Sequence, residues 1–389
     1  MKLRGTLNAI ARLNFNTLGE FALWAFQSTG YPTGPHGRRS PGFPAYLWSG
    51  LSGFISKIPL SRYSGVLIVA SVCLFAADSA PAASDQKPQL WFAPKDPIPR
   101  PAIYSGGSTD YLALFNSGPS WEDAAKYVSV FKLYPQFVSR ASDEDLGRVV
   151  RDLERRGIPL AIEIGILHQR QTCGHIEGHD NNQVDLGKRI QRLGGEVAYF
   201  VADEPLYFGH SFAGKQGCRD PLPSLAEEAA GTARAFRAVF PNVKFVETEP
   251  ISNFQEPDWV ELIGRWHAEF ARAFGEPFSS FTIDVNWQQP WRERVSAIVA
   301  RMRADHMPIG LICNGDRDDP TDQAWIDHAR QRCEAFERVT GAPPDIVVFQ
   351  SWVPRPTHVL PEDAPDSFTH LILEYARSHH LPPARPEGR

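Results

Sequence analysis

The segment VSVFKLYPQFVSRASDEDLGRVVRDLERRGIPLAIEIGI, residues 128–166, decides the fold. Its two ends, 128–134 and 160–166, are short apolar runs rich in β-branched and aromatic residues, which are typical of buried strands. Between them, residues 143–156 place apolar side chains at helical spacing. A strand, a helix and a second strand in this order predict a βα unit, whose two strands run parallel.

The same alternation of strand-like and helix-like segments continues on both sides of this unit. The apolar runs number eight and lie at 90–93, 128–134, 160–166, 197–202, 243–248, 281–285, 309–313 and 346–349. Amphipathic helical segments lie between them, at 143–156, 224–239, 259–274, 291–303 and 322–339. Eight strands in a domain of this length predict the α/β class and a single (β/α)8 TIM barrel. A doubly wound open sheet is the alternative, but no G-x-G-x-x-G or P-loop motif follows the first strands.

Two connections of this barrel are unusually long. They follow the third and fourth strands, at 168–182 and 207–223. Long loops after the strands of such a barrel usually carry function. We therefore expect the site to involve these two loops.

Composition and charge narrow the class of protein. Of 389 residues, 42% are hydrophobic and 22% are charged, which excludes a disordered or collagen-like chain. The net charge of -5 is unevenly distributed, because residues 1–84 carry seven basic and two acidic side chains. Residues 85–389 therefore have a charge of -10, which disfavours a nucleic-acid partner.

The basic opening segment has the form of a leader. The run VLIVASVCLFAA at 66–77 is preceded by Lys57 and Arg62 and followed by a small-residue A-x-A-like exit. This pattern is typical of a secretory signal peptide, near 57–83, and the run is too short for a stable membrane span; a short buried helix is the alternative. We predict that 1–84 is a leader, with 1–56 a non-native upstream extension. The barrel at 85–389 would then be exported, to the periplasm or the medium.

The cysteines divide along the same boundary. Cys73 lies in the apolar run, whereas Cys173, Cys218, Cys313 and Cys333 remain in the barrel. An even number permits disulfides in an oxidising compartment. Cys173 and Cys218 fall in the two long loops, so we predict that they pair, while Cys313 and Cys333 are equally compatible with free buried thiols. None of the spacings is that of a zinc site.

Polar residues gather where the predicted strands end. In such barrels the chemistry lies at the carboxyl ends of the strands. In strand order these ends carry Lys132 and Tyr134, Glu163, Asp203 and Glu204, Glu247 and Glu249, Asp284, Asn286 and Trp287, Asn314 and Asp316, and Gln350, Ser351 and Trp352. Carboxylates thus cluster on the third to sixth strands. Burying them together is costly unless they are paired, bound to metal or needed at a shifted pKa.

Individual members of this set also have structural explanations. Glu163 can pair with Lys132, and Asp316 can cap a turn. Glu247 and Glu249 share one face of their strand, because side chains alternate in direction.

Two chemistries use such a cluster. Glycoside hydrolysis needs one carboxylic acid to protonate the leaving oxygen and a second carboxylate as nucleophile or base. Alternatively, Glu163, His168, Glu249 and Asp284 offer ligands for a hard divalent cation, as in a metal-dependent sugar lyase or isomerase. Aromatic side chains at the same strand ends favour hydrolysis, because flat apolar faces stack on sugar rings. This reading requires neither a metal nor a cofactor.

The chain resembles the TIM-barrel glycoside hydrolase superfamily. The resemblance rests on the string ADEP at 202–205 and on Ser351-Trp352, and it covers about 88–377. In the large retaining clan, an Asn-Glu pair ends the fourth strand and supplies the acid/base, and a tryptophan after the eighth strand lines a sugar subsite. The strings at 110–112 and 349–352 also resemble uncharacterised bacterial exported members.

Two departures from the clan affect the assignment. Asp203 stands where the clan has asparagine, and the region 313–316 lacks the nucleophilic glutamate of the seventh strand. The second carboxylate is therefore expected to be Glu249, with Asp284 or Glu247 as alternatives.

Together these features predict an exported, monomeric glycosidase that acts on a poly- or oligosaccharide. The expected catalytic residues are Glu204 as general acid, Glu249 as nucleophile or base, and Asp284. The expected substrate-binding residues are Lys132, Tyr134, Glu163, Asp203, Asn286, Trp287, Asn314, Gln350 and Trp352. Two alternatives remain open. One is the metal-dependent lyase or isomerase, and the other is a non-catalytic glycan-binding barrel that serves surface polysaccharide assembly.

Overall fold

The computed structural model describes residues 87–99, 106–116, 120–168, 170, 183–215 and 217–385. The predicted leader at 1–84 lies outside these residues, so its processing stays a prediction. No helix within the described part is long and apolar enough to cross a membrane.

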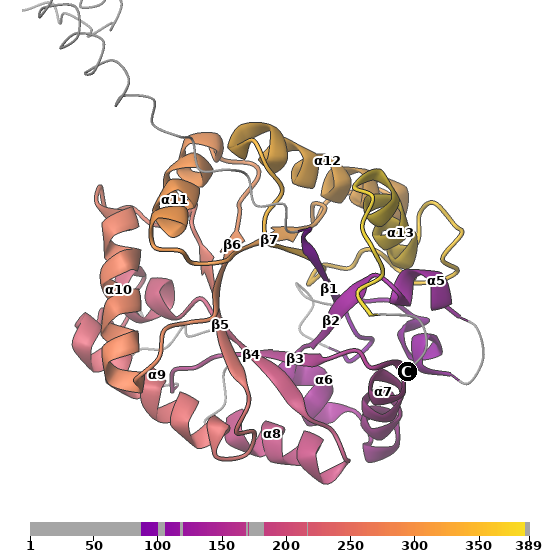
Figure 1. The fold of residues 1–389 in the computed structure, drawn as a ribbon, viewed down its shortest axis with the longest axis horizontal. Helices are drawn as coiled ribbons and strands as arrows, with labels where there is room; N and C mark the ends of the chain where they lie inside the picture. The colour runs from indigo at the N-terminus through magenta and orange to yellow at the C-terminus, as the bar shows by residue number, and fades with distance from the viewer. Residues whose placement is uncertain are drawn as a thin grey trace, which may run out of the picture. The chain divides into compact units, whose positions relative to one another are not determined.

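Eight parallel strands form a closed barrel in sequence order (Figure 1). Each strand pairs with the next, and the eighth pairs with the first through five residue pairs, from Gln89 with Ile346 to Ala93 with Gln350. The strands are β1 (Gln89–Ala93), β2 (Val128–Leu133), β3 (Leu160–Ile164), β4 (Val197–Asp203), β5 (Lys244–Pro250), β6 (Ser280–Asp284), β7 (Ile309–Cys313) and β8 (Ile346–Gln350). The predicted (β/α)8 barrel is confirmed, and the open doubly wound sheet is wrong.

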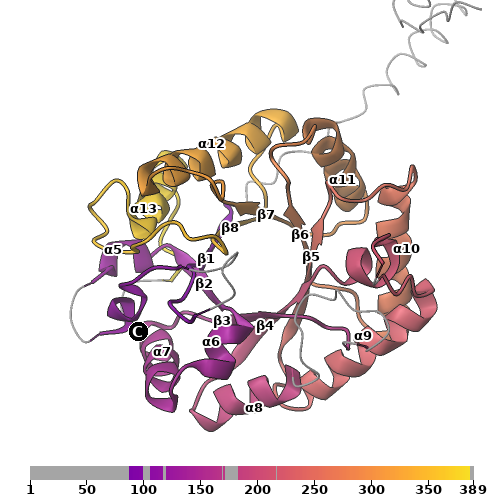
Figure 2. The same cartoon turned by 180° about the vertical axis from the view of Figure 1, so that it is seen from behind.

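Helices surround the ring of strands, as the reverse view also shows (Figure 2). They are α5 (Glu122–Ala125), α6 (Pro135–Arg140), α7 (Asp143–Arg156), α8 (Gln183–Arg192), α9 (Leu222–Arg237), α10 (Trp259–Phe274), α11 (Arg292–Ala304), α12 (Asp322–Thr340) and α13 (Phe368–Ser378). Two shorter turns are the 3-10 helix η3 (Tyr111–Phe115) and the π-helix η4 (Tyr207–Ser211). Each helical segment expected from the sequence is present, with ends within two residues of those predicted.

Helix α7 shows how local sequence sets such boundaries. The Ser142 hydroxyl accepts a hydrogen bond from the Asp145 N–H at 3.0 Å, which satisfies one unpaired donor of the first turn. Gly157 ends the helix at φ 64°, a left-handed conformation that glycine adopts without steric cost. The helix therefore starts and stops where the sequence supplies these two residues.

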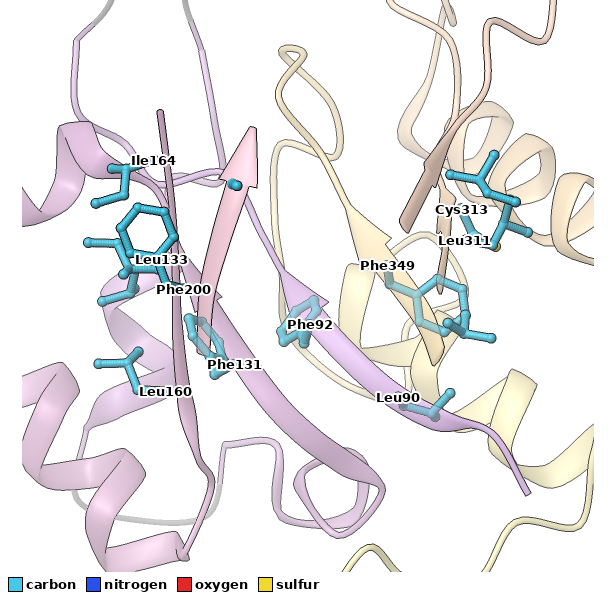
Figure 3. Close-up of a cluster of buried hydrophobic side chains, with 14 of the residues drawn as sticks. Leu90, Phe92, Phe131, Leu133, Leu160, Ile164, Phe200, Leu311, Cys313 and Phe349 are labelled. Atoms are coloured by element: carbon cyan, nitrogen blue, oxygen red, sulfur yellow. The ribbon is translucent and has the colours of Figure 1, made fainter. Parts of the chain in front are cut away.

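The strands separate two apolar layers. The larger layer lies between the strands and the helices, and Figure 3 shows part of it, including Phe92, Phe131 and Phe349. The smaller layer fills the barrel interior with Trp91, Val130, Ala161, Val201, Val246, Ile312, Ile346 and Val348. Because side chains alternate along a strand, these eight residues identify which other strand residues point inward.

A disulfide joins the barrel to its helical layer. Cys313 at the end of β7 is bonded to Cys333 of α12, with the Cα atoms 5.7 Å apart. The alternative of free thiols at these two positions is therefore wrong. Cys218 is also disulfide-bonded. Its expected partner, Cys173, lies outside the described residues, so that pairing stays a prediction.

Removing this disulfide is expected to lower the free energy of unfolding of the oxidised protein. The double variant Cys313→Ala/Cys333→Ala should lose about 3 kcal/mol, since the bond closes a loop of moderate length in the unfolded chain. Urea unfolding monitored by circular dichroism measures the change. Fully reduced wild-type protein is the control and should unfold close to the reduced variant. Equal stability of the oxidised wild type and the variant would contradict the expectation.

Candidate active site at the carboxyl end of the barrel

Four polar side chains lie inside the carboxyl end of the barrel. Lys132, Glu163 and Gln350 each follow an inward apolar residue by two positions, on β2, β3 and β8, and Asp284 ends β6. The alternation of strand side chains therefore places them above the inner apolar layer. The structure thus brings together four of the residues that the sequence predicted for the site.

Three of the four form a closed hydrogen-bonded network. The Lys132 ammonium group donates to a Glu163 carboxylate oxygen and to Gln350 Oε1. Gln350 Nε2 in turn donates to both Glu163 oxygens, at 3.2 and 3.3 Å. All three side chains are buried. Such mutual satisfaction stabilises a buried ion pair that would otherwise be costly.

Asp284 differs from this network because its side chain is partly exposed. Burial of its surroundings and the negative charge of Glu163 raise the pKa of Asp284 to about 7, although Lys132 and the Val285 N–H lower it. An aspartate in that range exchanges its proton near neutral pH. General acids and bases work best in this pKa range.

Glu204 follows β4 in an unusual backbone conformation. Its φ is 47°, its N–H donates to the Thr248 carbonyl at 2.9 Å, and its carbonyl accepts from the Phe208 N–H at 3.1 Å. Glu204 therefore lies between Asp203, the last residue of β4, and the turn that leads into η4. A left-handed conformation costs a non-glycine residue about 1–2 kcal/mol. Both Asp203 and Glu204 are partly exposed.

Glu249 lies on the outer face of β5, away from the barrel interior. Its neighbour on that face, Glu247, bonds to Trp266 and His267 of α10, outside the barrel. The expectation that the two glutamates share one face is confirmed, and that face is turned toward the helices. Glu249 is fully buried.

The contacts of Glu249 tie it to the turn after Glu204. One carboxyl oxygen accepts from the Leu206 N–H at 2.6 Å and the other from the Tyr207 N–H at 3.1 Å. Burial and the charge of Glu247 hold the pKa of Glu249 well above its usual value, against the two backbone hydrogen bonds. The position suits a residue that fixes the turn rather than one that contacts substrate.

Aromatic residues lie along the rim above these carboxylates. Trp287 Nε1 donates to Asn314 Oδ1 at 3.2 Å, and the Trp287 ring lies 5.0 Å from that of Trp291. Trp352 is partly exposed and packs against the inner apolar layer. Tyr134 is buried, and its hydroxyl donates to the Ser351 carbonyl at 2.9 Å. Trp287 and Trp352 thus remain available for stacking, whereas Tyr134 links the ends of β2 and β8.

Asn286 has a local structural role. Its Oδ1 accepts from the Gln288 N–H at 3.1 Å, which is the geometry of an Asx turn. Its own N–H donates to the Ser252 hydroxyl at 3.1 Å, which links the loops after β6 and β5. The side chain is exposed on the rim.

The ligand set of the metal-dependent alternative does not assemble in the described residues. His168 contacts Glu228, with Nδ1 3.4 Å from the carboxylate, and Glu249 faces the helices. The one histidine and carboxylate cluster of metal-site dimensions in that part of the chain is Asp316, Asp319 and His328. Asp316 there is ion-paired with Arg332 and accepts a hydrogen bond from Gln288 Nε2 at 3.0 Å.

A cavity of about 560 Å³ that begins at Tyr207, in the segment after Glu204, was not anticipated from the sequence. Its lining comes from η4 with the segment after it and from the loop after β5, and includes His210, Arg219, Asn253 and Glu256. The length of the loop after β4 was the available signal. The contribution of the loop after β5 depends on tertiary packing, which no local pattern reveals.

No family model and no curated protein matches this sequence. Among solved structures, a fungal β-1,4-galactanase is similar at 11% identity, over 74% of this chain and 100% of the galactanase, with a TM-score of 0.43. A family 10 endoxylanase from a sugarcane soil metagenome is similar at 10% identity, over 75% and 97% of the chains, with a TM-score of 0.46. An aldolase from Escherichia coli K12 is similar at 11% identity, over 75% and 90%, with a TM-score of 0.37. Likeness at such identities concerns the fold alone, so the activity has to be argued from this chain's own residues.

Proposed function

We propose that the barrel is an exported glycoside hydrolase that cleaves a poly- or oligosaccharide, with Asp284 and Glu204 as its paired carboxylates. The observation that carries this proposal is the environment of Asp284. Asp284 is partly exposed at the carboxyl end of the barrel, and its pKa is raised to about 7 by burial and Glu163. A carboxylic acid that stays partly protonated at neutral pH is what protonation of a leaving glycosidic oxygen requires.

The roles of the two carboxylates follow from their surroundings. Asp284 acts as the general acid, and Glu204 acts as nucleophile or as base toward water. The family resemblance assigns the acid to Glu204, and the raised pKa of Asp284 supports the reverse order. Glu249 is a positioning residue, because it holds the N–H groups of Leu206 and Tyr207 just after Glu204.

The remaining predicted residues have roles in this proposal. Trp287 and Trp352 offer apolar faces to sugar rings, and Asp203 and Asn314 offer oxygen acceptors to sugar hydroxyls. Lys132, Glu163 and Gln350 set the charge around Asp284 from below, where the network is buried.

Export is part of the proposal and has two supports. Residues 57–83 have the pattern of a signal peptide, and the barrel carries the Cys313–Cys333 disulfide. Disulfides persist in oxidising compartments and are rare in the cytosol. Fractionation of expressing cells, with N-terminal sequencing of the exported chain, tests this support independently of activity.

The test of the activity starts with product release from a panel of purified polysaccharides. On a responsive substrate, Asp284→Asn is expected to lower kcat about 10²–10⁴-fold, the usual contribution of a general acid. On an aryl glycoside whose leaving group departs without protonation, the same variant should keep most of its activity. Wild-type activity should fall as pH rises through about 7, where Asp284 loses its proton, and the variant should lack this decline.

Asp305→Asn is the matched control, because Asp305 is exposed and precedes β7, at the end of the barrel opposite the proposed site. It should behave as wild type. Equal loss of activity on both kinds of substrate would refute the acid role of Asp284. Binding of a glycan without any product release would instead support the non-catalytic alternative.

A further inference from the structure

The cavity lined by Tyr207 and η4 has the size of a ligand site. Its volume of about 560 Å³ lies within the range of about 300–1,000 Å³ that small-molecule sites occupy. It opens between η4 with the segment after it and the loop after β5. Both segments follow the carboxyl ends of barrel strands, the side on which the proposed catalytic carboxylates lie.

Two aromatic rings form the apolar wall of the cavity. The rings of Tyr207 and Phe212 lie 5.9 Å apart at 64°, and Tyr207 also packs on Phe254 at 5.5 Å. Packing against several rings fixes the Tyr207 ring in place. Preformed aromatic faces of this kind receive the C–H face of a sugar ring.

Arg219 supplies a cation to the same cavity. Its side chain is exposed, one guanidinium nitrogen donates to the Ala213 carbonyl at 3.0 Å, and it forms no ion pair with any described residue. Guanidinium has five donors in a planar fork that matches a carboxylate. The residue also has a φ of 53°, a costly conformation for a side-chain-bearing residue. A strained, solvent-facing arginine with no carboxylate partner in the described part of the chain suits recognition of an anionic ligand group.

The other polar groups complement sugar hydroxyls. His210 Nδ1 contacts the Asp220 carbonyl at 2.6 Å, so that nitrogen carries the proton and Nε2 is left for a ligand. Glu256 lines the cavity from the loop after β5, and its negative charge acts on Arg294. Arg294 therefore offsets part of the negative charge of Glu256, whereas Arg219 forms no ion pair with any described residue.

Tyr207 links the cavity to the proposed catalytic centre, because it lines the cavity and follows Glu204 by three residues. The pKa of the Tyr207 phenol is raised by burial and by the negative charges of Glu204 and Glu256. Tyr207 therefore lies within electrostatic reach of both carboxylates, one at the proposed catalytic centre and one in the cavity. A sugar bound in the cavity would contact Tyr207, three residues after Glu204.

We propose that this cavity is a subsite for a uronic acid residue, whose carboxylate is bound by Arg219 while its ring stacks on Tyr207 and Phe212. The substrate class of the proposed hydrolase is then an acidic polysaccharide. The inference rests on the proposed function for its position in the reaction, but the binding of a uronate does not depend on catalysis.

Binding is measured by isothermal titration calorimetry with the exported chain carrying Glu204→Gln, so that no ligand is consumed. The probes are oligomers of galacturonate, glucuronate and mannuronate or guluronate, each compared with its neutral methyl ester of the same length. At least one acid oligomer should bind roughly tenfold more tightly than its ester, and added Arg219→Ala should abolish that difference. Higher salt should weaken binding of the acid oligomer more than that of the ester.

Lys215→Ala is the matched control, because Lys215 is an exposed cation of the same loop that does not line the cavity. It should leave the preference for the acid oligomer unchanged. Arg219→Lys keeps the charge but loses the planar fork, and should retain only part of the preference. Equal affinity for acid and ester across all the oligomers, or equal loss with Lys215→Ala, would overturn the subsite.

The two proposals fail separately. Uronate binding that depends on Arg219, without hydrolysis of any polysaccharide, acidic or neutral, would overturn the hydrolase and leave the subsite. Hydrolysis of a neutral polysaccharide by the wild type, without any preference for acid oligomers, would overturn the subsite and leave the hydrolase.

Discussion

Replacing Glu204 by glutamine is expected to lower kcat on a responsive polysaccharide by about 10²–10⁴-fold, while the folded structure is retained. Glutamine has the shape of glutamate but can neither attack a sugar carbon nor accept a proton from water. The backbone contacts of residue 204, to Thr248 and Phe208, involve main-chain atoms and survive the change. Release of reducing ends measures the activity, and circular dichroism confirms the fold.

Glu196→Gln is the matched control for this variant. Glu196 is exposed and precedes β4 at its opposite end, so the same chemical change is made far from the carboxyl ends. It should leave kcat unchanged. If Glu204 is the nucleophile, azide should restore part of the cleavage in Glu204→Ala, where the shorter side chain leaves room for it to attack the anomeric carbon, expel the leaving sugar and form a glycosyl azide. Full activity of Glu204→Gln would show that its role is wrong.

The backbone at Glu204 gives an independent reason to expect function there. A glutamate at φ 47° is strained, and glycine or asparagine would adopt this conformation more easily. Strained residues persist where the surrounding structure imposes them and are concentrated at active sites. A glutamate therefore stands at a position where the left-handed backbone conformation lowers the stability of the fold.

The fold could be predicted from the sequence because its signal is local and repeated. Each βα unit has its own pattern of apolar residues, a short apolar run for the strand and helical spacing for the helix, as 128–133 and 143–156 show. Eight repetitions leave few topologies open. The inward network of Lys132, Glu163 and Gln350 follows from the same alternation once one inward residue of each strand is known.

The orientation of Glu249 could not be predicted in this way. The spacing of Glu247 and Glu249 shows that they share a face but not which face, because both faces of a barrel strand are buried. The outer face accepts carboxylates here because Trp266 and His267 of α10 provide partners. Those partners lie in a helix about 20 residues away, and no local pattern links them to β5.

Removing the ammonium group of Lys132 is expected to lower the free energy of unfolding by about 3–5 kcal/mol. In Lys132→Met, Glu163 would keep only Gln350 as a partner inside the barrel, and a buried carboxylate without its cation is costly. The pKa of Asp284 should rise further, because Lys132 is a group that lowers it. Urea unfolding measures the first effect, and the alkaline limb of the pH–activity profile measures the second.

The double variant Lys132→Met/Glu163→Gln separates the ion pair from simple packing. Removing both charges leaves no unpaired buried carboxylate, so much of the lost stability should return. In Glu163→Gln alone the pKa of Asp284 should fall, because the negative charge that raises it is gone, and activity should then decline at lower pH than in the wild type. A double variant as unstable as Lys132→Met, with an unmoved pH profile in Glu163→Gln, would contradict the coupling of this network to Asp284. Opposite shifts of the alkaline limb in the two single variants would instead tie the buried pair directly to the proposed acid, since no purely structural role changes the sign of that shift.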